Sequence, residues 1–83
     1  MPRYYFDIHD GHEPHTDMVG AELPDDNAAR EEATRTIADL AKEYLPHDGS
    51  HRRITIAVRG ADGSTLLDES LAFDINQRQP SQS

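Results

Sequence analysis

Residues 25–45, DDNAAREEATRTIADLAKEYL, carry the longest periodic pattern in the chain. Asp25 or Asp26 can cap the free amides of a first helical turn, and Pro46 cannot continue a helix. The apolar side chains between these signals recur every three or four positions, as on the buried face of an amphipathic helix: Ala29, Ala33, Ile37, Leu40 and Tyr44. The stretch therefore predicts one helix over this range.

Alternating apolar and polar residues on either side of this helix predict the strands on which it lies. Residues 3–9, RYYFDIH, and 52–59, RRITIAVR, alternate cleanly. Residues 65–75, TLLDESLAFDI, return after a turn at Asp62-Gly63, which is a strong hairpin signal. A short strand near Met18-Val19 would run back antiparallel along the first.

The last predicted strand contains one polar residue on its inward side. Leu71, Phe73 and Ile75 form the inward set, and the same phase turns Glu69 inward as well. A β-bulge at Asp68-Glu69 would restore the phase. We therefore predict a bulge there.

Together these elements predict an α+β fold in the order β-(β)-α-β-β. An antiparallel sheet of three or four strands carries one helix packed across one face. Residues 1–75 form a single α+β domain, and residues 76–83 are polar and aperiodic, as in a disordered tail. One helix covers one face only, so we expect a homodimer formed by the open face or by edge strands. The interface candidates on that face are Tyr5, Thr55, Ala57 and Ala72.

Composition excludes several classes of function. The chain has no cysteine, which excludes disulfides, zinc–thiolate sites and thiol nucleophiles. No apolar run has the length of a signal peptide or a membrane span, so we expect a cytoplasmic protein without membrane contact. The net charge of −8 argues against direct nucleic-acid binding, but is compatible with a basic protein partner.

Three histidines near the N-terminus form the densest group of potential ligands. His9, His12 and His15 could bind zinc, nickel or copper if a loop gathered them. Four potential carboxylate ligands lie among them: Asp7, Asp10, Glu13 and Asp17. The spacing of three between the histidines does not match a strand, and no helix is predicted there. A polar turn between strands is the simpler interpretation, and the three remain weak metal candidates.

No catalytic or cofactor motif is present. Ser50, Ser64 and Ser70 lack a G-x-S-x-G context, and the glycines near Asp62 belong to a hairpin instead of a phosphate-binding loop. We therefore expect no catalytic residues, no cofactor and no enzymatic activity.

The opening MPRYYFDIHDG, the pattern D-x-x-G-x-E-L-P-D at residues 17–25 and the segment AAREEA together resemble a family of short proteins from soil and root-nodule bacteria. Members of that family open MPRYFF or MPRYYF and are classed as a domain of unknown function. The resemblance implies one helix followed by a strand hairpin, and implies no catalytic residues. A looser likeness of layout is to the HicB-type antitoxin domain, although the matching DNA-binding segment is absent.

The sequence thus predicts a small cytoplasmic interaction module that self-associates through its open sheet face or an edge strand, without catalysis. One alternative is a metal-binding protein that uses His9, His12 and His15. Another is an antitoxin-like partner of a basic protein.

Overall fold

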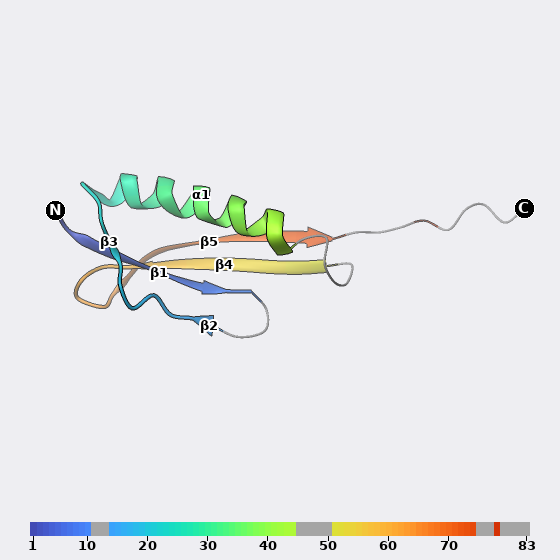
Figure 1. Cartoon of the computed structure of the whole chain (residues 1–83), viewed down its shortest axis with the longest axis horizontal. Coiled ribbons are helices and arrows are strands. Elements are labelled where there is room, and N and C mark those ends of the chain that lie inside the picture. The colour runs from blue at the N-terminus through green and yellow to red at the C-terminus, as the bar shows by residue number, and fades with distance from the viewer. Residues whose placement is uncertain (11–13, 45–50, 75–77, 79–83) are drawn as a thin grey trace, which may run out of the picture.

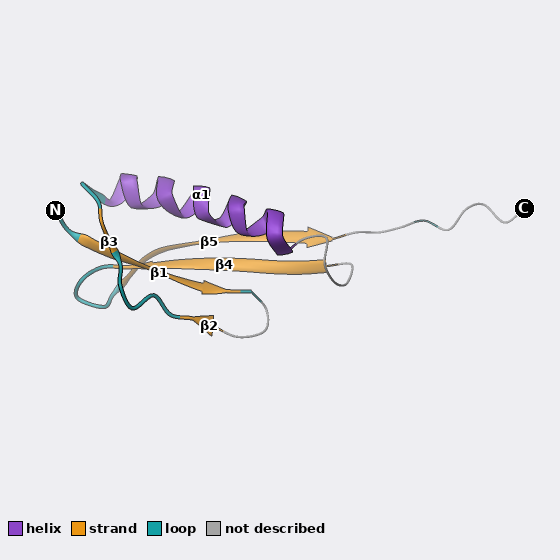
Figure 2. Cartoon of the chain, in the orientation of Figure 1, coloured by secondary structure: helices purple, strands orange, loops and turns teal. Residues whose placement is uncertain are grey.

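The computed structural model describes residues 1–10, 14–44, 51–74 and 78, with only the backbone for Tyr44, His51 and Arg52. Within these residues the predicted α+β fold is confirmed: one helix lies against one antiparallel sheet (Figures 1 and 2). The predicted tail at residues 76–83 lies outside the described residues, apart from Arg78. The elements are β1 (Arg3–His9), β2 (Pro14–His15), β3 (Ala21–Glu22), α1 (Asp26–Tyr44), β4 (His51–Arg59) and β5 (Thr65–Asp74).

The sheet has the order β2-β1-β4-β5, and β3 also pairs with β1. All of these pairs are antiparallel. The chain that returns along β1 forms two strands of two residues each, one on either side of Met18 and Val19. The returning strand was therefore predicted in the right direction but at the wrong residues, because Met18-Val19 occupies the bend between β2 and β3.

The helix begins where its capping residue predicts. The Asp25 carboxylate accepts a hydrogen bond from the Ala28 amide (2.8 Å), which satisfies one of the free donors of the first turn. Asp26 accepts a hydrogen bond from the Tyr4 hydroxyl (2.7 Å), which fixes this end of the helix to β1. The helix begins one residue later than predicted, at Asp26, and is described as far as Tyr44, while the predicted last residue, Leu45, lies outside the described residues.

The core lies between α1 and the strands β1 and β4. Alanines on the helix let its backbone approach the sheet closely, and three β-branched residues of β4 fill the space beneath. The buried set is Tyr4, Ala29, Ala33, Ile37, Ala41, Ile54, Ile56 and Val58. Of the predicted helical stripe, Ala29, Ala33 and Ile37 are thus buried and Leu40 is partly covered, while the side chain of Tyr44 is not among those described.

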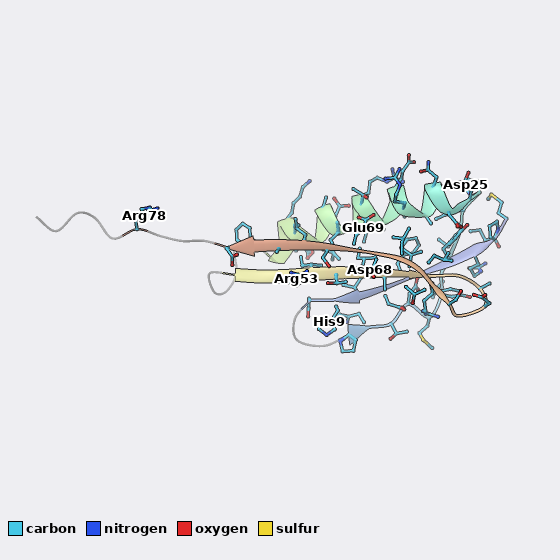
Figure 3. All side chains as sticks on the ribbon, turned by 180° about the vertical axis from the view of Figure 1, so that it is seen from behind. His9, Asp25, Arg53, Asp68, Glu69 and Arg78 are labelled. Atoms are coloured by element: carbon cyan, nitrogen blue, oxygen red, sulfur yellow. The ribbon has the colours of Figure 1, made fainter. Side chains whose placement is uncertain are left out.

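The predicted bulge at Asp68-Glu69 is wrong. The pairing of β5 with β4 is continuous there, with Glu69 opposite Ile56 and Asp68 opposite Ala57, and the irregularity falls between Val58 and Arg59. Glu69 therefore does face the helix, as Figure 3 shows. It is tolerated because β5 is at the edge of the sheet, where its carboxylate meets a helix hydroxyl: Thr34 Oγ1 lies 3.0 and 2.9 Å from its two oxygens.

The face of the sheet opposite the helix carries all four of the predicted interface residues. Directly opposite residues of an antiparallel pair share a face. Tyr5 lies opposite Arg59, Thr55 opposite His9, Ala57 opposite Asp7 and Ala72 opposite Arg53. Their placement follows from the alternation, while their role as an interface stays a prediction.

Candidate functional site

The densest polar contacts in the structure surround Asp17, in the bend between β2 and β3. Its carboxylate accepts hydrogen bonds from the amides of Phe6 (3.1 Å), Val19 (3.0 Å) and Gly20 (3.0 Å). Burial raises the pKa of Asp17, but these amides and the nearby Arg59 together lower it more, so the pKa lies below its ordinary value. The carboxylate thus holds the bend in one conformation.

Arg59, at the end of β4, connects this bend to the sheet. Its guanidinium donates two hydrogen bonds to Asp7, at 2.5 and 3.2 Å, and one to the carbonyl of Asp17 at 3.1 Å. It also lies over the Tyr5 ring, 4.9 Å from the centroid. The hydrogen bond from Arg59 is the largest cause of the lowered pKa of Asp7.

Gly20 is required by the close approach of this bend to β1. Its φ is +77°, and a Cβ atom there would lie 2.9 Å from the Tyr4 carbonyl oxygen and 2.9 Å from the Tyr5 ring. Next to it, Arg3 donates to the Val19 carbonyl (2.9 Å) and to the Glu22 carboxylate (3.0 Å).

These contacts assign structural roles to the residues of the D-x-x-G-x-E-L-P-D pattern. Asp17 and Gly20 form the bend, Glu22 binds Arg3, and Asp25 caps the helix. A general acid or base acts best when its pKa lies near the working pH. The pKa values of Asp7 and Asp17 are both shifted down and away from neutrality. The two carboxylates therefore fit a structural role better than proton-transfer chemistry.

The predicted metal ligands are not brought together by the sheet. His9 pairs with Pro14 and His15 pairs with Ile8, so the two histidines lie on opposite faces. His15 Nε2 is 3.8 Å from Asp10 Oδ2, and His12 lies outside the described residues. In the part of the chain that the structure describes, no group of three or more His, Asp or Glu side chains is placed to hold a metal ion.

The described serines also serve the fold. Ser64 Oγ lies 2.7 Å from the Asp62 carboxylate within the hairpin turn, and Ser70 Oγ lies 3.0 Å from Thr55 Oγ1 across β4 and β5. Ser50 lies outside the described residues. These contacts assign Ser64 to the hairpin turn and Ser70 to the pairing of β4 with β5.

The candidate site is therefore a surface of the sheet. The open face carries small side chains near its centre, where Thr55 lies opposite Ser70, and its two alanines lie opposite charged residues, Ala57 opposite Asp68 and Ala72 opposite Arg53. The outer edge of β5 is ten residues long, and in the described structure only β4 pairs with it. Leu71 on this strand is 36% exposed. The alternation in the sequence identified the open face. Only the strand order seen in the structure shows that β5 lies at an edge of the sheet.

Comparison with known protein families gives a match over most of the chain. The family model described as a domain of unknown function, DUF6894, matches residues 3–72. No curated protein and no solved structure matches the chain significantly. Among the described residues, α1 lacks the long apolar run that a membrane-crossing helix needs. The match agrees with the resemblance in its central respect, a family without an assigned function, and its range includes Asp7, Asp17, Gly20 and Arg59. The chain belongs to the DUF6894 family.

Proposed function

We propose that this chain is a small cytoplasmic interaction module that associates with a second copy of itself through its sheet, and that it has no catalytic activity of its own. The observation that carries the proposal is the position of β5, a ten-residue strand with one neighbour in the described structure. A strand of this kind presents a row of backbone donors and acceptors to another chain.

The other edge of the sheet is protected in a way that β5 is not. Along β1, the short strands β2 and β3 occupy part of the backbone, and Asp17 accepts the amide hydrogen of Phe6 between them. The chain thus covers one edge with its own residues. No comparable cover lies along β5 among the described residues, which makes it the better docking edge.

The open face is the second surface through which two copies could meet. Its central side chains are small, but its β1 half carries the paired charges of Arg59 and Asp7 beside Tyr5. Burying these groups against another sheet costs desolvation free energy. The edge of β5 needs no such burial, so we favour the edge over the face.

Two other functions remain alternatives. Metal binding by His9, His12 and His15 is weakened by the opposite facing of His9 and His15. An antitoxin-like role with a basic partner protein is compatible with the net charge of −8. A basic partner requires an association that weakens as salt is added, whereas edge-strand pairing depends far less on ionic strength.

Light scattering on the purified, tag-free protein tests the proposal. A dimer whose mass is the same with and without zinc supports it. A monomer at every concentration contradicts self-association, and a mass that changes only with zinc favours the metal-binding alternative. The matched variants Ala57→Lys, on the open face, and Ala61→Lys, in the exposed hairpin turn, separate the two surfaces, since only a face-to-face dimer is disrupted by the first and spared by the second.

A further inference from the structure

We infer that two copies pair β5 with β5, antiparallel and centred on Ser70, so that the two sheets become one. This inference rests on the proposed self-association and specifies its geometry. Three properties of the edge support it: the residues whose backbone faces outward, the side chains that would oppose each other, and the position of the helix.

The first property follows from one hydrogen bond on the opposite edge. The Phe6 amide donates to Asp17, away from β4. Backbone groups alternate in direction along an antiparallel strand, so Tyr5, Asp7 and His9 direct theirs toward β4.

The same alternation continues across the sheet. The β4 residues opposite Tyr5, Asp7 and His9 form their backbone hydrogen bonds with β1. The β4 residues that alternate with them therefore form their backbone hydrogen bonds with β5. The backbone groups of Ile54 therefore hydrogen-bond to those of Leu71, and the backbone groups of Ile56 to those of Glu69. The outward donors and acceptors of β5 then belong to the remaining residues: Asp68, Ser70, Ala72 and Asp74.

The second property disfavours three of the registers that two-fold pairing allows. Two-fold pairing places one residue opposite its own copy. A centre at Glu69 opposes two Glu69 carboxylates, a centre at Asp68 opposes two Asp68 carboxylates, and a centre at Leu71 opposes Asp68 to Asp74. Directly opposed like charges are destabilising.

A centre at Ser70 avoids every one of these oppositions. Each Asp68 then lies opposite the partner's Ala72, and each Glu69 opposite the partner's Leu71. Glu69 already contacts Thr34 of its own helix, so its carboxylate is held on its own side. Three outward pairs, with two backbone hydrogen bonds each, give about six bonds in this register.

The third property is the place of α1, which packs over β4 and β5 (Figure 1). Neighbouring strands lie about 4.8 Å apart, so a helix above the middle of this pair lies about 2.4 Å sideways from β5. Joining two β5 strands then places the two helix axes about 10 Å apart, which is a normal helix-packing distance. Thr34 and Ala38, small and exposed on the flank nearest β5, allow this approach.

Opposite charges placed at Ala72 test the register. Ala72 would face the partner's Asp68 twice in a dimer, so Ala72→Lys tightens the dimer and Ala72→Glu weakens it. Two cross-strand pairs correspond to a change of roughly 2- to 30-fold in the dimer Kd in each direction. Within one chain Ala72 lies opposite Arg53, so Ala72→Glu favours the folded monomer and a loss of dimer cannot come from unfolding.

The controls use the same charges elsewhere. Ala61→Lys and Ala61→Glu, in the exposed turn, change the net charge equally and leave the Kd within about 2-fold. The double variant Asp68→Lys/Ala72→Glu restores the affinity that Ala72→Glu loses. Sedimentation equilibrium measures all of these constants.

Four results would overturn the inference. If both Ala72 variants weaken the dimer, the open face is the interface. If neither changes the Kd, the copies associate elsewhere, and if the double variant restores nothing, the register is wrong; in these three cases the proposed self-association survives. A monomeric wild-type chain would overturn both.

Discussion

Arg59 and Asp7, separated by 52 positions in the chain, form a two-point ion pair on the open face of the sheet. The same guanidinium reaches the Asp17 carbonyl, so one side chain connects β4, β1 and the bend between β2 and β3. The pair therefore fixes the protected edge of the sheet relative to its centre.

Replacing Arg59 by methionine is expected to lower the urea midpoint of unfolding, because the Asp7 carboxylate loses its charged partner while remaining three-quarters buried and keeps, among the described residues, only the hydrogen bond from the Asp17 amide. Arg35→Met is the matched control. Arg35 also binds a carboxylate, Glu32 at 2.8 Å, but on the exposed helix surface where such pairs contribute little. Equal midpoints for the two variants would show that the Arg59 contacts do not hold the fold.

Substitutions at the two described glycines with positive φ distinguish the free-energy cost of backbone strain from the cost of a steric collision. Gly63→Ala, at φ +89° in open space, is expected to cost about 1–2 kcal/mol through its backbone alone. Gly20→Ala adds a collision with the Tyr4 carbonyl and is expected to cost about 2–5 kcal/mol in total. Chemical unfolding measures both changes, and a Gly20 variant as stable as the Gly63 variant would contradict the close approach.

Acid is expected to destabilise the fold through Asp7 and Asp17. Both have folded-state pKa values below the ordinary value of 3.8, so the unfolded chain binds protons more readily. Their contribution is fully present above about pH 5 and is lost as the pH falls through the lowered values. Urea midpoints between pH 2 and pH 7 should fall less steeply in Asp17→Asn than in the exposed-helix control Asp39→Asn, and parallel curves would refute this assignment.

The Tyr4 hydroxyl is expected to ionise at a higher pH than an ordinary tyrosine. Its hydrogen bond to Asp26, its burial and the nearby carboxylates raise its pKa to about 12 from 10.0. Its contribution to stability is present below pH 10 and is lost as the pH rises toward 12. Absorbance titration should show a late component that disappears in Tyr4→Phe and persists in Tyr5→Phe; a late component in both variants would assign it to another group.

The sequence predicted the regular elements well, because each long element carries its own period. The apolar spacing from Ala29 to Leu40 defined the helix, and the alternation of Ile54, Ile56 and Val58 defined the central strand. The same alternation placed Ala57 and Ala72 correctly on the open face. These predictions needed only local information.

The remaining features depended on strand register, which alternation leaves open. Nothing local pairs Arg59 with Asp7, so Asp7 and Asp17 were grouped with the histidines as potential ligands. Strands of two residues, such as β2 and β3, are too short to show a period. One signal for the bend was present: an aspartate that bonds the amides two and three positions later is typical of an Asx turn, and Asp17 followed by Gly20 fits it.

Hydrogen exchange of individual β5 amides, measured by NMR over a range of protein concentrations, tests the edge-to-edge association most directly. The outward amides of Asp68, Ser70 and Ala72 should exchange rapidly in dilute protein and become protected as the concentration rises. The amides of Glu69 and Leu71, which bond to β4, should be protected throughout. Outward amides that exchange equally fast at every concentration would contradict the account, because no second chain would then occupy the edge of β5.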